Sequence, residues 1–190
     1  MTNDAKKVRL VELLNERAVK RGEFTLRSGA KSSFYIDGKM VTLHPESLSL
    51  AADLILDAVA GDRLDSIGGP TLGADPIIGA VVARSHEIGR PVSGFIIRKE
   101  VKDHGTGKLI EGPLAPGARV AVVEDTTTRG GMVLHSIEAL REFGAEVVRV
   151  LTIVDREAGA REAVEELGVA FTSLVTLREL GLEPEGGSNG

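Results

Sequence analysis

The chain has 190 residues, of which 42% are hydrophobic and 27% charged, and its formal net charge is −5; this suits one ordinary globular domain rather than two. It contains no cysteine, which excludes disulfides, thiolate metal sites and a cysteine nucleophile. The acidic balance and the few aromatic residues, five Phe, one Tyr and no Trp, argue against a nucleic-acid partner. No apolar run approaches the ~18 residues of a membrane span, so we expect a cytoplasmic protein without a membrane partner.

The first sixty residues predict two helices separated by a segment of short strands. Apolar residues recur at helical spacing from residue 4 to about 20, which predicts an amphipathic helix; they are Val8, Val11, Leu14 and Ala18. Residues 22–40, GEFTLRSGAKSSFYIDGKM, then mix β-like pieces with turn residues. The following HPESLSLAADLILDAVA has Pro45 in its first turn and a repeating Leu/Ala face, which predicts the second helix.

Beyond this helix, predicted strands and helices alternate. The strands are LDSIGG, VSGFIIRKE, ARVAVVEDTTT, AEVVRVLTIVDRE and VAFTSLVT, and the helices are ADPIIGAVVARSHEIG, GGMVLHSIEALREFG and GAREAVEELG. Continuously apolar strands that alternate with helices are typical of a parallel sheet covered on both faces. Ligands bind beyond the carboxyl ends of such strands. We therefore expect GGPTLGAD, EDTTTRGG and VDREAG to be neighbours on one rim of the sheet.

The stretch VAVVEDTTTRGG, residues 120–131, ends a predicted strand in two acids, three threonines, an arginine and two glycines. A helix is predicted to start near Met132, and the amino end of a helix attracts phosphate. Glycines allow close approach of the backbone, and threonine hydroxyls add donors. The simpler interpretation is that the threonines only cap the helix, but one threonine is enough for that. The Walker and G-x-G-x-x-G phosphate motifs are both missing from the sequence.

Glu124 and Asp125 would repel a phosphate, so we expect them to face another part of the ligand. Paired carboxylates accept hydrogen bonds from vicinal sugar hydroxyls, or hold hydrated Mg²⁺ indirectly, through water or those hydroxyls. A 5-phosphorylated ribose satisfies both halves of the stretch. Its phosphate would bind the threonine–glycine turn, and its 2- and 3-hydroxyls would bind the two acids.

The stretch resembles the phosphoribosyl-pyrophosphate (PRPP) binding signature of type I phosphoribosyltransferases, which are glycosyltransferases. The resemblance implies an α/β protein of the type I phosphoribosyltransferase fold, with a central parallel β-sheet flanked by helices and a small N-terminal hood subdomain. It also implies PRPP binding by Glu124, Asp125, Thr126, Thr127, Thr128, Arg129, Gly130, Gly131 and Met132. The signature alone says little about the acceptor base.

A second stretch, RKEVKDHGTGKLIEG at residues 98–112, follows a predicted strand and contains five basic residues and three glycines. This predicts a mobile loop. A solvated charged loop is the simpler interpretation, but a basic lid at the ligand rim suits a reaction in which pyrophosphate leaves. The stretch resembles the catalytic loop of the orotate phosphoribosyltransferase family. The resemblance implies a homodimer in which this loop reaches the partner's site, PRPP contacts from Arg98, Lys99, Lys102 and His104, and catalytic roles for Lys102, Asp103 and His104.

Two further segments resemble the same family and imply the acceptor contacts. The segment GEFTLRSGAKSSFYIDG is similar to the family's hood, and VDREAG is similar to a segment that binds the acceptor's carboxylate. The implied orotate contacts are Arg27, Tyr35, Ile36, Thr128 and Arg156. An arginine suits a planar base that bears a carboxylate. One departure is the sequence TLGA at residues 71–74, where several family members have an aromatic–lysine pair, so a lysine contact with PRPP is missing.

The resemblance runs from about residue 10 to 180 and implies Mg²⁺-dependent transfer of the phosphoribosyl group from PRPP to orotate in pyrimidine biosynthesis. We expect residues 1–182 to form a single domain, with the hood mainly in residues 1–40 plus a C-terminal segment, and residues 183–190 to be a disordered tail. The alternatives are a transferase for another base, a PRPP-sensing transcription regulator and a non-catalytic partner subunit. The hood and Arg156 argue against the first, and the acidic charge and the basic loop argue against the second.

Overall fold

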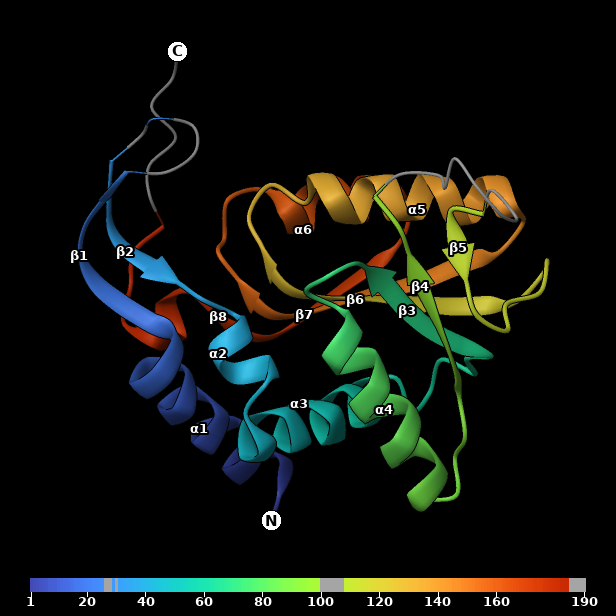
Figure 1. Ribbon diagram of the computed structural model, residues 1–190, viewed down its shortest axis with the longest axis horizontal. Helices are drawn as coiled ribbons and strands as arrows, with labels where there is room; N and C mark the ends of the chain where they lie inside the picture. The colour runs from blue at the N-terminus through green and yellow to red at the C-terminus, as the bar shows by residue number, and fades with distance from the viewer. Residues whose placement is uncertain (26–28, 30, 100–107, 185–190) are drawn as a thin grey trace.

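The computed structural model describes residues 1–25, 29, 31–99 and 108–184, and its centre is a six-stranded sheet with the order β5-β4-β3-β6-β7-β8 (Figure 1). Neighbouring strands are parallel except for the short β5, which runs antiparallel to β4. The strands are β3 (Ser66–Pro70), β4 (Ser93–Ile97), β5 (Ile110–Glu111), β6 (Arg119–Thr127), β7 (Glu146–Asp155) and β8 (Ala170–Thr176). The predicted α/β class with a central parallel sheet is confirmed.

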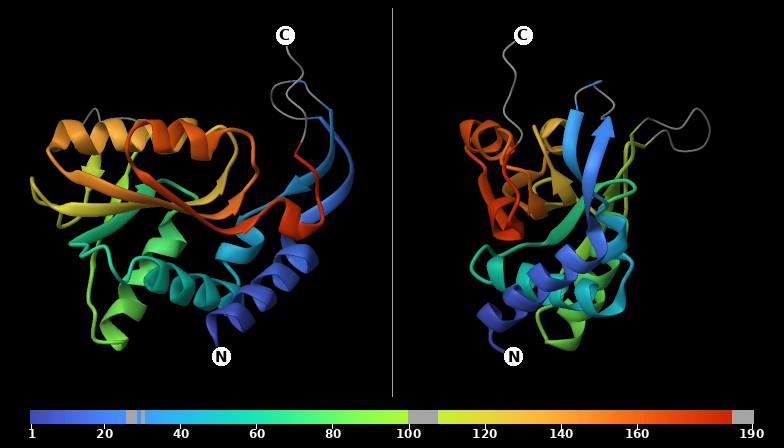
Figure 2. Two further views of the ribbon diagram at one scale, coloured as in Figure 1. Left: turned by 180° about the vertical axis from the view of Figure 1, so that it is seen from behind. Right: turned by 90° about the vertical axis from the view of Figure 1, so that its left-hand side faces the viewer.

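Helices cover both faces of the sheet (Figures 1 and 2). One face packs against α1 (Asn3–Leu13), α3 (Pro45–Ala58) and α4 (Asp75–Glu87), and the other against α5 (Gly131–Phe143) and α6 (Ala160–Glu166). A hydrophobic core lies on each face of the sheet, and the side chains of β6 point alternately into the two. Ala121 and Val123 belong to the core beside α1, α3 and α4, and Val120 and Val122 belong to the core beside α5 and α6. All four side chains are fully buried, and each buried valine stabilises the fold by roughly 1.5–3 kcal/mol. Within the described ranges, every helix is too short or too polar to cross a membrane.

The N-terminal hood is an antiparallel hairpin of β1 (Val19–Thr25) and β2 (Lys31–Ile36), followed by the short helix α2 (Lys39–Thr42). Burial alternates along β2, with Ser32, Phe34 and Ile36 buried and the residues between them exposed. Figure 1 shows the hairpin to one side of the sheet. It reaches the carboxyl ends of β6 and β7, because Gly38 approaches Asp125 and Phe34 lies under the Arg156 side chain.

Three local differences from the sequence-based expectations concern short or terminal elements. The helix expected up to about residue 20 ends at Leu13 and continues as a wider π-turn, η1 (Leu14–Ala18). Val19 is already extended and pairs with Ile36, so hairpin pairing overrides the helical periodicity. The elements α2 and β5 were not predicted, because four and two residues are too few to show a period. The hood boundaries and the tail stay predictions, and residues 185–190 lie outside the described residues.

Candidate active site

The turn between β6 and α5 encloses a hollow of about 210 Å³, lined by Glu124 and residues 126–133. Thr126 and Thr127 are among the lining residues, and their buried Oγ1 atoms have no hydrogen-bond partner among the described residues. The N-cap of α5 is Gly130, in the left-handed conformation with φ of 76°, and no side chain of the described chain caps this helix. The interpretation that the threonines only cap the helix is therefore wrong.

The hollow suits a small oxyanion such as a phosphate ester. A buried polar group without a partner costs about 1–3 kcal/mol, and the oxygens of a bound anion would accept hydrogen bonds from both hydroxyls. The first residues of α5 line the same hollow, and the backbone N–H groups at the amino end of a helix have no intrahelical acceptors. Gly130 is needed for its positive φ, and a Cβ there would also lie 3.3 Å from the Cβ of Ala160. The turn thus combines a small hollow, the amino end of a helix and two hydroxyls that have no partner in the part of the chain described.

The two predicted acids end the buried part of β6 beside this hollow. The backbone N–H of Asp125 donates a hydrogen bond of 3.1 Å to Oε1 of Glu124. Burial and, next, the neighbouring charge of Asp125 raise the pKa of Glu124 to about 8. Two adjacent carboxylates in a half-buried position cost free energy while they lack donors. The pair is therefore suited to accept hydrogen bonds from ligand hydroxyls.

Backbone from two other segments approaches the acids closely. A Cβ on Gly73 would lie 2.7 Å from Oε1 of Glu124, and a Cβ on Gly38 would lie 2.8 Å from Oδ2 of Asp125. Any side chain at these two positions would displace the carboxylates. The loop at residues 71–74, which follows β3, and the junction between β2 and α2 in the hood therefore meet the end of β6. This confirms that the GGPTLGAD and EDTTTRGG segments are neighbours on the rim.

The basic residues predicted for the pyrophosphate lie partly outside the described residues. Arg98 follows β4, its backbone N–H donates to the carbonyl of Leu109 at 2.9 Å, and its Nε is buried without a hydrogen-bond partner in the part of the chain described. Lys99 is exposed beside it. The predicted residues Lys102, Asp103 and His104, and Arg27 of the hood, lie outside the described ranges.

The turn after β7 holds Arg156 at the same rim. The backbone N–H of Arg156 donates to the carbonyl of Thr127 at 2.9 Å, which confirms that VDREAG and EDTTTRGG are neighbours. Oδ1 of the buried Asp155 accepts the backbone N–H of Glu157 at 2.9 Å and closes the turn around Arg156. Burial also raises the pKa of Asp155. The Arg156 guanidinium carbon lies 5.4 Å from the centre of the Phe34 ring.

Tyr35 and Ile36, predicted as a pair that contacts the acceptor, lie on opposite faces of β2. Tyr35 is 44% exposed and packs beside Phe24 with ring centres 5.9 Å apart, whereas Ile36 is 8% exposed. Their two side chains therefore point to opposite faces of the strand. Phe34 shares the inward face with Ile36 and was not predicted as a site residue. The period of two along a strand was the signal that could have found it.

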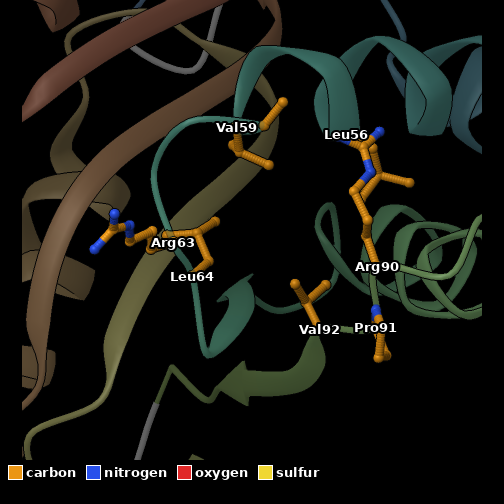
Figure 3. A pocket seen from close by; sticks show the side chains of 8 residues that line it. Leu56, Val59, Arg63, Leu64, Arg90, Pro91 and Val92 are labelled. Atoms are coloured by element: carbon orange, nitrogen blue, oxygen red, sulfur yellow. The ribbon is translucent and has the colours of Figure 1, made fainter.

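A second hollow, also of about 210 Å³, lies before the amino ends of β3 and β4, at the rim opposite the acids (Figure 3). Its lining is Leu56, Val59, Ala60, Arg63, Leu64, Arg90, Pro91 and Val92. Figure 3 shows Arg63 extending away from the labelled residues on the other side of the hollow. None of the acids, threonines or glycines predicted for the ligand lies there, so the carboxyl rim is the candidate site.

The chain is similar to known proteins over nearly all of its length. It is 46% identical over 180 residues to an orotate phosphoribosyltransferase of Corynebacterium glutamicum, a match that covers 95% of this chain and 96% of the relative. The crystal structure of Mycobacterium tuberculosis H37Rv orotate phosphoribosyltransferase in complex with Fe(III) dicitrate matches with a TM-score of 0.84 and 41% identity, over 93% of this chain and 99% of that one. The same enzyme in complex with PRPP matches with a TM-score of 0.80 and 39% identity, over the same shares. The chain matches no family model.

The raised pKa of Glu124 should make the free energy of unfolding depend on pH. Because the pKa in the folded protein, about 8, exceeds the ordinary 4.5, the folded state binds more protons than the unfolded state between these values. The free energy of unfolding must then fall as the pH rises through this range. We expect Glu124→Gln to remove this loss, so that its melting temperature, measured with EDTA and without ligand, falls by several degrees less than that of the wild type between pH 5 and pH 8.5.

The exposed Glu16 provides a matched control, and Glu16→Gln should follow the wild-type curve. Parallel melting curves for Glu124→Gln and the wild type across this pH range would show that Glu124 titrates normally in the folded protein.

Proposed function

The chain belongs to the orotate phosphoribosyltransferase family, and on that premise we propose that it transfers the 5-phosphoribosyl group of PRPP to orotate. The products are orotidine 5′-monophosphate and pyrophosphate, in pyrimidine biosynthesis. The observation in the site that carries this proposal is the pair Glu124 and Asp125 beside a hollow lined by Thr126 and Thr127, whose hydroxyls have no partner within the described ranges. One loop thereby offers acceptors for a sugar diol and donors for a phosphate.

In the proposed complex, the carboxylates of Glu124 and Asp125 accept hydrogen bonds from the 2- and 3-hydroxyls of the ribose. The 5-phosphate occupies the hollow and receives hydrogen bonds from the threonine hydroxyls and from the first N–H groups of α5. The residues proposed for this phosphate are Thr126, Thr127, Thr128, Arg129, Gly130, Gly131 and Met132. The direct succession of the acids and the other residues that line the hollow along one strand end supports this arrangement, because one ribose phosphate carries both its diol and its phosphate.

The acceptor is proposed to bind between the hood and the turn after β7. Arg156 would pair its fork of N–H donors with the carboxylate of orotate. Thr128, Arg27, Tyr35 and Ile36 would contact the base. The position of the Arg156 guanidinium over the ring of Phe34 supports this, because it brings the arginine of this turn against the hood.

The proposed reaction forms a bond from a base nitrogen to the anomeric carbon of the ribose while the bond from that carbon to pyrophosphate breaks. The transition state resembles an oxocarbenium ion, and the departing pyrophosphate gains negative charge. We propose that Arg98, Lys99, Lys102 and His104 neutralise this charge, and that Asp103 lies among them in the lid. The protein acts mainly by positioning both substrates and by stabilising charge away from water.

The donor set fits Mg²⁺ that is held largely by the substrate. Among the described residues there is no group of three or more side chains that could hold a metal ion, whereas the diphosphate of PRPP offers oxygens to a hard cation. Glu124 and Asp125 would then hold the ion indirectly, through water or the ribose hydroxyls. Bound Mg²⁺ would supply positive charge that offsets the charge of the diphosphate.

This function is tested by the absorbance of orotate during incubation with PRPP and Mg²⁺. We expect loss of orotate absorbance with release of one pyrophosphate per orotate, and no reaction when PRPP, Mg²⁺ or the protein is omitted. Adenine, hypoxanthine, xanthine and uracil, supplied in place of orotate, should react at least a hundredfold more slowly, because they lack the carboxylate that Arg156 would bind. Preferred turnover of a purine would support the alternative transferase, and salt-dependent DNA binding without pyrophosphate release would support the regulator.

We further propose a homodimer in the cytoplasm, in which the basic loop of each subunit serves its partner's site. The variants Lys102→Ala and Asp125→Asn should each lose most of their kcat when expressed alone. Co-expressed in equal amounts, they should regain roughly a quarter of the wild-type activity, because half of the dimers would be mixed and each would contain one intact site. If the co-expressed mixture is as inactive as the separate variants, each loop serves its own subunit.

A further inference from the structure

We propose that Lys39 is a further ligand-binding residue of this site, whose ammonium group contacts the diphosphate of PRPP from the side of the hood. This inference rests on the proposed function, because it names a residue that would bind the leaving group of that reaction. Three observations carry it: the contact of the hood with the two acids, the fixed position of Lys39 beside that contact, and the uncharged sequence of the loop that meets the acids from β3.

The backbone of the hood meets the acids immediately before Lys39. A Cβ on Gly38 would lie 2.8 Å from Oδ2 of Asp125 and 3.1 Å from Oγ1 of Thr126, so this glycine is in close contact with both side chains. Consecutive Cα atoms are about 3.8 Å apart, and the side chain of Lys39 adds a flexible four-carbon stem. Its ammonium group can therefore reach the acids without any movement of the backbone.

The backbone at Lys39 is held in place on both sides. Oδ1 of Asp37 accepts its N–H at 3.2 Å, and its own carbonyl accepts the N–H of Leu43 at 3.0 Å. The preceding carbonyl, of Gly38, accepts the N–H of Thr42 at 2.9 Å. The Lys39 side chain is exposed, and in the described part of the chain no hydrogen bond or ion pair engages its ammonium group. The starting point of this side chain is thus fixed, and its charge is available to a ligand.

The charge of Lys39 acts on the acid pair. Burial and then the charge of Asp125 raise the pKa of Glu124, and the positive charge of Lys39 opposes both effects. The interaction between two charges weakens with distance and with exposure to water. The ammonium group therefore lies near enough to the acids to interact with what they bind.

In the proposed complex, the diphosphate of PRPP begins beside the same two acids. It is bonded to the anomeric carbon, which is the direct neighbour of the carbon that carries the 2-hydroxyl. With the ribose hydroxyls on Glu124 and Asp125, the charge of the diphosphate and the charge of the acids repel each other. A cation beside the acids offsets this repulsion.

The loop after β3 does not provide that cation. It meets the acids through Gly73, but residues 71–74 read TLGA and bring no positive charge. Lys39 approaches from the hood and offers the charge that this loop lacks. An ammonium group is a common partner of phosphate oxygens in proteins, so the diphosphate is the ligand group that suits Lys39.

The test measures the Kd of PRPP and of ribose 5-phosphate by calorimetry in the presence of Mg²⁺. The two ligands share the ribose and its 5-phosphate and differ in the diphosphate. In Lys39→Gln, we expect the Kd of PRPP to rise about tenfold, as for the loss of a hydrogen bond to a charged group, while the Kd of ribose 5-phosphate stays constant. Lys39→Arg, which keeps the charge, should bind PRPP within about threefold of the wild type.

The exposed Lys20 on β1 provides a matched control, because Lys20→Gln removes the same charge from the same hairpin. Neither Kd should change in this variant. A cooperative melting transition in each variant shows that it is folded.

An unchanged Kd for PRPP in Lys39→Gln would overturn the inference. So would an equal rise for both ligands, because Lys39 would then act on the acids and the ribose rather than on the diphosphate. An equal rise for PRPP in Lys20→Gln would also overturn it, since the overall charge of the hood would then be the cause. These outcomes leave the proposed function intact as long as the unsubstituted protein converts orotate. If the unsubstituted protein neither binds PRPP nor converts orotate, the proposed function and the role of Lys39 both fail.

Discussion

Two adjacent carboxylates at the end of a buried strand are the constraint on which the rest of the site depends. Both acids are partly removed from water, and burial, followed by the charge of Asp125, raises the pKa of Glu124 to about 8, so ionising both acids costs free energy. Such a pair is retained where a ligand supplies the missing donors. The backbone packs closely around the two acids at Gly38 and Gly73, because a Cβ at either position would collide with a carboxylate.

The same two glycines explain how separate parts of the chain form one site. Gly38 belongs to the junction between the hood and the core, and Gly73 to the loop after β3. Both touch the end of β6, and Arg156 is bonded to the carbonyl of Thr127 only two residues beyond the acids. A shift of the hood would therefore act both on Arg156, through Phe34, and on Asp125, which are the residues proposed for the acceptor and for the ribose. This physical link supports a site in which both substrates are positioned by one rigid framework.

Much of this arrangement was predictable from sequence, because long apolar strands and the run EDTTTRGG have few alternative interpretations. The sheet, its helices and the proximity of the three rim loops followed from periodicity and from the geometry of parallel strands. Sequence could not show that Gly130 rather than a threonine caps α5, since this depends on backbone angles. The opposite orientation of Tyr35 and Ile36 would have followed from the period of two, once residues 31–36 were assigned to one strand. Phe34 was missed because a buried phenylalanine in a strand looks like any other core residue until its contact with Arg156 is known.

The central claim is that Glu124 and Asp125 bind the ribose hydroxyls, and the most direct measurement compares ribose 5-phosphate with 2-deoxyribose 5-phosphate. Both ligands would be titrated into the wild type and into a variant with Glu124→Gln and Asp125→Asn. The account predicts that the wild type prefers ribose 5-phosphate by about fivefold or more, as expected for a hydrogen bond to a charged group, and that the variant loses this preference. An equal preference in both proteins, or none in the wild type, would contradict the account.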